Sequence, residues 1–241
     1  FDAKVEIAEG TVATLGNKTL APSVAGKTIT FPYMGLDYNT TYTFTLPGNS
    51  VSDFYGNKIK ENITLKFTTI APPVVTPGMY DAIASNAEEL LEALAKGNEA
   101  STSGERFRIF LHDGIYDLGE LCLTDVKSNI SLIGESMENT IIVNKAPVEG
   151  MTVSATLRPT GENIYMQDLT LKNDYDYQGS TGRAVCLQDK GNKNVYKNIR
   201  MLSYQDTYYS NNNRMRSYFE DSEIHGTVDF ICGGGDVFFN R

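Results

Sequence analysis

Two aspartates in the last part of the chain, Asp206 and Asp229, have the residue type and spacing for paired acid chemistry. Asp206 lies within the segment Tyr-Gln-Asp-Thr-Tyr (204–208), and Asp229 lies within the largely apolar segment Gly-Thr-Val-Asp-Phe-Ile (226–231). The number of residues from Asp206 to Asp229 equals the number of residues from Arg183 to Asp206. If this interval brings the carboxylates together, they cannot both ionise freely and one pKa rises. Such a pair can supply a proton donor and a nucleophile.

The flanking sequence repeats with the same interval. The segments 195–201 and 218–224 are similar and are offset as Asp206 and Asp229 are, and a further match, at a longer interval, joins residues 166–171 to 196–201. Short strand-like runs that repeat with such a period, about 20–30 residues, are typical of a solenoid, in which each repeat forms one coil. Strands of adjacent coils lie about 4.8 Å apart, so residues one period apart share a face. We therefore expect Asp206 beside Asp229, with Arg183 one coil below.

The composition narrows the range of functions. The 241 residues carry a net charge of −9, which argues against a nucleic-acid partner. No apolar run approaches the roughly 20 residues that span a bilayer. The three cysteines form no disulfide or zinc pattern, and the sequence offers no metal-ligand cluster, so we expect no metal site. With two histidines and no Gly-x-Ser-x-Gly segment, a Ser-His-Asp triad is nearly excluded.

The chain divides into two domains joined by a proline-rich linker. Alternating Thr-rich runs at 28–31, 42–46 and 63–68 predict a small antiparallel β-sandwich over residues 1–70. Residues 71–78 form the linker, and residues 79–241 form the solenoid. A helix over 87–95, with Ser85 or Asn86 as N-cap and Gly97 as its stop, is expected to cap the first coil. The predicted fold class is all-β: a right-handed parallel β-helix, a single-stranded solenoid, preceded by the sandwich.

Several segments carry a family resemblance. Gly-Arg-Ala-Val-Cys-Leu (182–187), Tyr-Gln-Asp-Thr-Tyr and Gly-Thr-Val-Asp-Phe-Ile resemble three ordered signature patches of the pectin methylesterases (pectinesterases). Gly114-Ile115-Tyr116 and the segment 130–135 resemble two earlier patches, so the likeness covers roughly residues 78–241. Residues 36–42, 53–57 and 67–69 resemble the bacterial Ig-like modules that precede surface and secreted enzymes.

The resemblance implies hydrolysis of the methyl ester on galacturonate units of pectin, with release of methanol. It assigns Asp229 as nucleophile, Asp206 as acid and base, and Gln205 as the donor to the oxyanion. Arg183, Tyr208 and Phe230 are then expected to bind substrate. The family implies a secreted, periplasmic or cell-surface bacterial enzyme without cofactor, and we expect a monomer.

Two departures qualify this expectation. Arg183 occupies the place of a Gln that helps to hold the oxyanion, and it either stabilises the oxyanion or points outward to pair with another acid. The family's downstream Leu-Gly-Arg-Pro-Trp patch is absent. We therefore expect a piece of a longer enzyme, clipped at its N-terminus and shortened at its C-terminus, with little or no activity alone.

Two other functions remain open at this stage. The chain could be a non-catalytic pectin-binding β-helix, a reading that Arg183 favours. It could also be a polygalacturonate glycoside hydrolase, although an inverting hydrolase needs carboxyls about 6.5–9.5 Å apart, more than one coil spacing.

Overall fold

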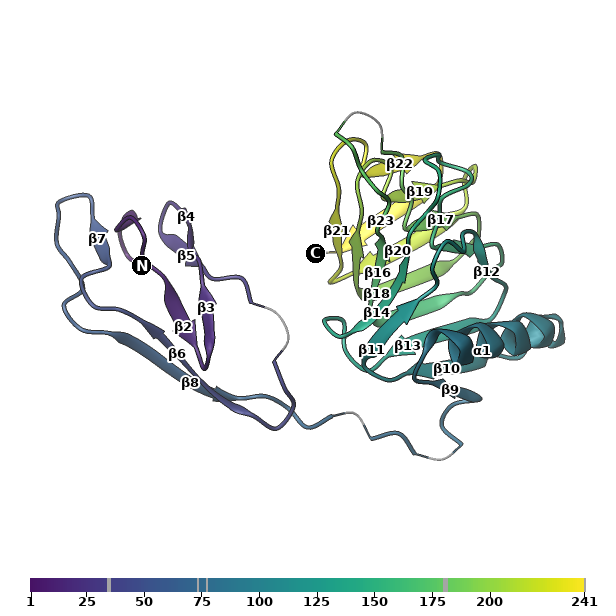
Figure 1. The fold of residues 1–241 in the computed structure, drawn as a ribbon, viewed down its shortest axis with the longest axis horizontal. Helices are drawn as coiled ribbons and strands as arrows, with labels where there is room; N and C mark the ends of the chain where they lie inside the picture. Colours follow the sequence, from purple (N-terminus) through teal and green to yellow (C-terminus); the bar gives the residue numbers. More distant parts are fainter. Residues whose placement is uncertain (34–35, 73, 77, 180–181, 241) are drawn as a thin grey trace. The chain divides into compact units, whose positions relative to one another are not determined.

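The computed structural model (Figure 1) describes residues 1–33, 36–72, 74–76, 78–179 and 182–240. The chain forms two compact units, Phe1–Pro73 and Val74–Arg241, which divide within the predicted linker. Two linker residues, Pro73 and Pro77, lie outside the described residues, as does Arg241 at the end of the predicted solenoid.

The first unit consists of short antiparallel strands. A four-stranded sheet has the order β3-β2-β6-β8, and two further pairs are β1-β7 and β4-β5. In β6 the threonines at 41 and 43 face solvent while Tyr42 and Leu46 are buried, as the alternating sequence predicts. The strands are β1 (Val5–Ile7), β2 (Ala13–Leu15), β3 (Lys18–Leu20), β4 (Ser23–Ala25), β5 (Thr28–Thr30), β6 (Thr41–Leu46), β7 (Val51–Asp53) and β8 (Ile63–Thr68).

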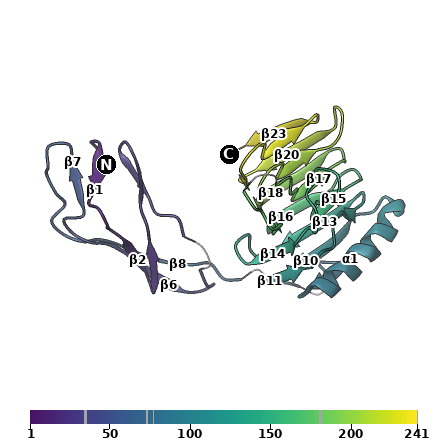
Figure 2. The same ribbon diagram turned by 45° about the horizontal axis from the view of Figure 1, so that its top comes forward.

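The second unit is a parallel β-helix whose coils pass through three walls (Figures 1 and 2). The first wall contains β9 (Ala82–Ala84), β10 (Phe107–Leu111), β13 (Ile130–Gly134), the first halves of β16 (Tyr165–Asn173) and β18 (Asn194–Leu202), β20 (Arg216–Glu220) and β23 (Asp236–Asn240). The second wall contains β11 (Gly114–Asp117), β14 (Thr140–Asn144), the second halves of β16 and β18, and β21 (Glu223–His225). The third wall contains β12 (Thr124–Val126), β15 (Leu157–Pro159), β17 (Leu187–Asp189), β19 (Tyr208–Ser210) and β22 (Ile231–Gly233).

The register confirms the repeats that the sequence predicts. Tyr165 pairs with Val195, and Val195 pairs in turn with Tyr218, so both pairings fall at the predicted intervals. The next step along the chain is shorter, because Tyr218 already pairs with Phe238. The length of a coil therefore varies while the strands stay aligned.

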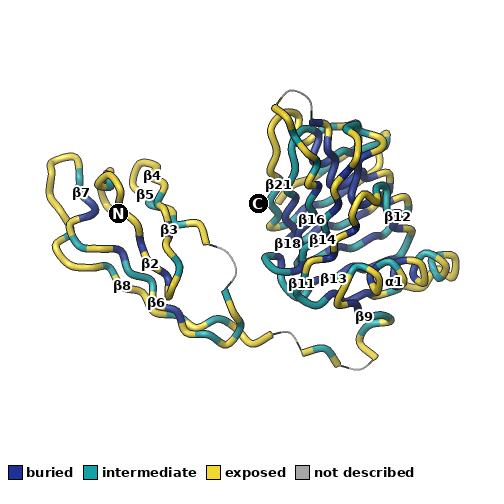
Figure 3. The backbone as a smooth tube through the Cα atoms, viewed as in Figure 1, coloured by how far each residue is buried: buried dark blue, intermediate teal, exposed yellow. Residues whose placement is uncertain are grey.

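Apolar side chains fill the interior of the coils. Buried stretches of the chain are dark blue in Figure 3. Tyr196 packs on Phe219 with ring centroids 4.7 Å apart, and Phe219 packs on Phe239 at 4.9 Å. These three residues lie above one another in the first wall, and their side chains all point inward. The apolar core of one coil therefore continues into the next.

Helix α1 (Ala87–Ala100) covers the first coil, followed by the 3-10 turn η1 (Ser101–Ser103). The N-cap is Asn86, whose Oδ1 accepts the backbone N–H of Glu89 at 3.0 Å. The prediction that Gly97 stops the helix is wrong. Gly97 lies inside α1, where an added Cβ would come within 3.0 Å of the Phe107 ring and 3.2 Å of Ile130, so the missing side chain permits close packing on the first coil.

A buried carboxyl group, Asp189, lies inside the coils at the end of β17. It accepts hydrogen bonds from Ser217 Oγ (2.6 Å), Asn194 Nδ2 (2.9 Å) and the Gly191 N–H (3.0 Å). Burial raises the pKa of Asp189, and the hydrogen bond from Ser217 opposes that shift. The group links the turn after β17 to the strand of the next coil.

We predict that Asp189→Asn destabilises the protein most at acidic pH. Because the folded-state pKa is raised, the folded protein holds this proton more tightly than the unfolded chain does, and this contribution to stability is lost as pH rises above the ordinary value of about 3.9. Urea unfolding of both proteins at several pH values from about 4 to 7 should show a difference in unfolding free energy that shrinks with rising pH. A difference that grows with pH would contradict the raised pKa.

Gly134 marks a close approach between coils. A Cβ there would lie 2.1 Å from the backbone oxygen of Asp168. We predict that Gly134→Ala lowers the unfolding free energy by about 1–3 kcal/mol, since the coils must move apart. The control is Gly114→Ala, whose Cβ would meet only the Ser85 oxygen at 3.7 Å. Equal unfolding midpoints for the two variants would show that the coil spacing at Gly134 is adaptable.

Candidate active site

The two predicted catalytic aspartates occupy the same corner of successive coils, just before β19 and β22 of the third wall. Both have left-handed backbone conformations, with φ of 62° at Asp206 and 49° at Asp229. Asp and Asn adopt this conformation more readily than most residues. Each aspartate therefore adopts the backbone conformation that the corner requires, and it also presents a carboxyl group.

Asp206 and Asp229 lie in vertical register. Tyr208 pairs with Ile231 of the next coil, and the Tyr208 N–H donates to the Phe230 carbonyl oxygen at 2.9 Å. The ladder continues to the corner, where the Asp206 N–H donates to the Val228 oxygen at 3.2 Å. The interval between the two aspartates thus places them on neighbouring coils, as the sequence predicts.

The two carboxyls have different surroundings. Asp206 is only 2% exposed, whereas Asp229 is exposed. Burial raises the pKa of Asp206, the Cys232 thiol lowers it, and the charge of Asp229 raises it. Within the described chain, Asp206 Oδ2 is buried without a hydrogen-bond partner, which favours a protonated carboxyl group.

Gln205 directly precedes the buried aspartate and is partly exposed. Its backbone is fixed by two hydrogen bonds, from its N–H to the Gly182 oxygen and from the Ala184 N–H to its own oxygen, each 2.9 Å long. Its side-chain amide makes no hydrogen bond to any other described residue, so the amide remains available to a ligand.

Arg183 lies one residue away from its expected place. It pairs with Gln205 rather than Asp206, because the third-wall step from Leu187 to Tyr208 is shorter than the repeat predicts. The guanidinium group binds Glu149 through Nε (2.7 Å) and a terminal nitrogen (2.5 Å). The alternative that Arg183 points outward to another acid is confirmed, and its role in binding substrate stays a prediction.

The structure contradicts the prediction that Tyr208 binds substrate. Its ring is fully buried in the core and packs edge-on against Phe219, with centroids 4.9 Å apart. Tyr208 faces inward because it pairs in register with Leu187, whose side chain also points into the core. Phe230, in contrast, is 42% exposed beside Asp229 and remains a candidate contact for a sugar ring.

Sequence reasoning missed three residues around the aspartates. Glu149 lies between β14 and β15, outside the repeats, so no periodic signal marks it. Cys232 lies beside both aspartates, and burial together with their charges raises its pKa to about 12, so its thiol stays protonated. Tyr177 stacks on Tyr204 with ring centroids 4.8 Å apart, at the rim of the same corner.

A family model of pectinesterases matches residues 81–241, two thirds of the sequence. The chain belongs to the pectinesterase family. A second family model, the bacterial Ig-like domain, matches residues 1–69. The pectinesterase unit thus contains both aspartates, and the Ig-like unit corresponds to the β-sandwich predicted before it.

Known pectinesterases resemble this chain in sequence and fold. Pectinesterase 2.2 of Solanum lycopersicum is 32% identical over 155 residues, covering 63% of this chain and 27% of its own length. Pectinesterase/pectinesterase inhibitor 18 of Arabidopsis thaliana is 33% identical over 157 residues, covering 62% and 26%. The chain spans less than a third of the length of these curated relatives.

Solved pectin methylesterases share the coil architecture. The enzyme from carrot superposes with a TM-score of 0.59 at 26% identity, covering 69% of this chain and 52% of its own. The enzyme from Erwinia chrysanthemi gives 0.57 at 26% identity, covering 70% and 55%. The parallel β-helix predicted for the pectinesterase unit is therefore confirmed.

Among the described residues there is neither a membrane-spanning helix nor a metal-binding cluster. None of their helices is both long and apolar enough to cross a membrane. No group of three or more His, Cys, Asp and Glu side chains within the described ranges is arranged to hold a metal ion.

We predict opposite pKa changes of Asp206 when the two members of the Arg183–Glu149 pair are replaced. The positive charge of Arg183 lowers the pKa of Asp206 and the negative charge of Glu149 raises it. Arg183→Gln should therefore raise the pKa of Asp206, and Glu149→Gln should lower it, as measured by titration of the carboxyl carbon by ¹³C NMR. Shifts of the same sign in both variants would show that the pair acts through structure rather than charge.

Proposed function

We propose that the protein demethylates pectin, with Asp229 as nucleophile and Asp206 as acid and base. The observation that carries this proposal is the vertical pairing of an exposed carboxyl with a buried one whose pKa is raised. Membership of the pectinesterase family supports the choice of reaction. A solved pectin methylesterase in complex with a hexasaccharide supports a polymeric sugar substrate.

In the first half of the reaction, the Asp229 carboxylate attacks the carbonyl carbon of the methyl ester. The negative charge that forms on the carbonyl oxygen accepts a hydrogen bond from the Gln205 amide. The tetrahedral intermediate collapses as the bond to the methoxy group breaks. Asp206 gives its proton to this leaving group, which departs as methanol.

In the second half, Asp206 acts as a base. Its carboxylate takes a proton from water, and the oxygen of that water attacks the galacturonate carbonyl in the acyl-enzyme. The bond to Asp229 breaks, which frees the unesterified galacturonate and restores both aspartates. Burial suits Asp206 to this exchange because it favours the protonated state in which the cycle begins.

The family and the bacterial Ig-like unit support a protein that acts outside the cytoplasm: secreted, periplasmic or on the cell surface. We propose a monomer as well. Arg183 and Phe230 border the two aspartates and would contact the polymer. Arg183 would meet an unesterified carboxylate near the scissile ester, since its charge suits an anion.

We predict that Asp229→Asn reduces methanol release from methylated polygalacturonate by the full-length protein to background. Asp206→Asn should cost about 10²–10⁴-fold and Gln205→Ala about 10²–10³-fold. Asparagine is chosen for the aspartates because it tolerates the left-handed corner.

Asp221→Asn is the matched control, because Asp221 is exposed and has the same φ of 49° at another corner. It should leave methanol release unchanged. New reducing ends that disappear in Asp229→Asn would instead indicate a glycoside hydrolase. Polymer binding without either product would indicate a binding protein.

A further inference from the structure

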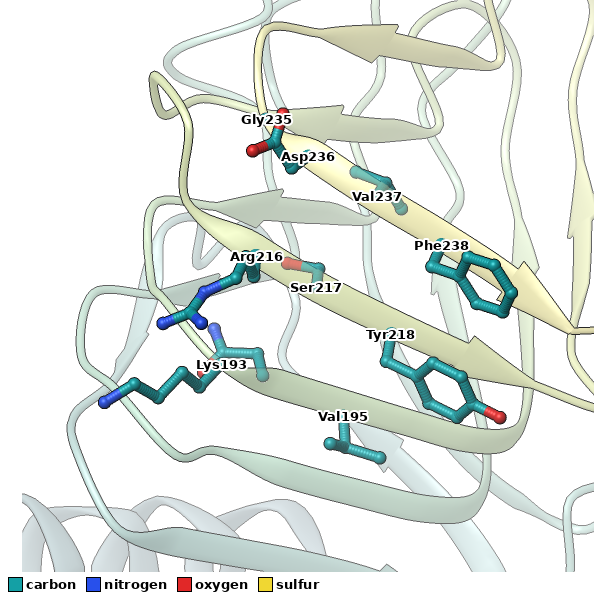
Figure 4. Close-up of a pocket in the computed structure, with 10 residues that line it drawn as sticks. Lys193, Val195, Arg216, Ser217, Tyr218, Gly235, Asp236, Val237 and Phe238 are labelled. Carbon is teal, nitrogen blue, oxygen red and sulfur yellow. The ribbon is translucent and has the colours of Figure 1, made fainter.

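The outer face of the first wall carries a groove on a different wall from the two aspartates. Its larger part has a volume of about 840 Å³ and runs across β18, β20 and β23 (Figure 4). A second hollow of about 350 Å³ continues it toward the first coils. Both parts share Lys193 and Val195, and we call them together the first-wall groove.

Three aromatic rings and one valine form the floor of the first-wall groove. Tyr165, Val195, Tyr218 and Phe238 follow one another in strand register, one per coil. Tyr218 and Phe238 stack with ring centroids 5.8 Å apart and planes only 5° apart, and Phe238 is 64% exposed. Figure 4 shows these two rings side by side above Val195. The parallel rings of Tyr218 and Phe238 offer neighbouring flat apolar faces, which suit the flat faces of pyranose rings.

Cationic side chains gather along the groove. They are Arg106, Arg108, Lys193 and Arg216, whereas Asp236 is the one acid among the described lining residues. Figure 4 shows Lys193 and Arg216 extending together past the same end of the strands. This concentration of positive charge stands out in a chain with a net charge of −9.

These cationic side chains make only weak electrostatic interactions with other described residues. Arg106 and Arg216 form no ion pair with any described residue, and their hydrogen bonds go to uncharged groups such as Ser131 Oγ and Asn192 Oδ1. Lys193 contacts Glu162 at 3.3 Å and Arg108 contacts Asp81 at 3.7 Å, and all four side chains are about half exposed. Exposed pairs of this kind contribute little to stability, so an anion can compete for them.

We propose that the first-wall groove binds a chain of unesterified galacturonate units outside the active site. The rings would hold the sugar faces, and the cations would pair with the carboxylates along one side of the polymer. This choice of anion rests on the proposed function, because removal of methyl esters creates such carboxylates. A methylated chain lacks those charges and would bind more weakly.

The test measures binding of an unesterified hexagalacturonate to the protein by isothermal titration calorimetry. The background is Asp229→Asn, so the result does not depend on esterase activity. Adding Lys193→Ala and Arg216→Ala should weaken binding about tenfold, more at low ionic strength. Tyr218→Ser should weaken binding at every ionic strength. The matched control is Lys96→Ala, which removes a lysine charge from the exposed face of α1.

Three results would overturn the proposal. One is equal affinity of the Lys193→Ala/Arg216→Ala protein and the Lys96→Ala protein. Another is equal affinity for the fully methylated hexamer. The third is a dimer that Tyr218→Ser converts to a monomer, since this face would then be an interface between two copies. A protein that releases no methanol but binds the anion in the groove would refute only the esterase proposal.

Discussion

The hydrogen-bonded register between successive coils is the constraint on which the other features depend. Parallel pairing fixes which residue of one coil lies over which residue of the next. The pairing of the two aspartates results from that alignment. The ladder through Tyr208 and Phe230 carries Asp206 over Asp229. The same register aligns the rings of the first-wall groove on another face.

The sequence alone predicted much of this arrangement because its repeats are visible. The recurring intervals predicted the coils and the paired aspartates. Arg183 was misplaced because coil length differs between walls: the third-wall step from Leu187 to Tyr208 is shorter than the first-wall step from Val195 to Tyr218. The prediction for Tyr208 is wrong because an aromatic residue near a predicted catalytic aspartate gives no sign of whether it faces inward or outward until the strand alternation is known. Glu149 could not be predicted, since it lies in an irregular segment outside the repeats.

Different exposure gives the two aspartates different chemistry although their backbones are alike. Both occupy left-handed corners, yet one carboxyl is withdrawn from water and the other is not. The Arg183–Glu149 pair adds opposing charges near Asp206: Arg183 lowers the pKa of Asp206 and Glu149 raises it. In this chain an exposed ion pair thus replaces the neutral amide that the family resemblance leads one to expect.

The unequal coils have a consequence for how the rim of the site can change. The connection from β16 to β17 covers residues 174–186, whereas the equivalent connection from β18 to β19 covers only 203–207. The longer connection carries Tyr177, whose ring reaches Tyr204 beside the aspartates. Residues can be gained or lost in such a connection without shifting any strand against its neighbour. The rim beside the aspartates can therefore change in this loop while the carboxyl pair keeps its alignment.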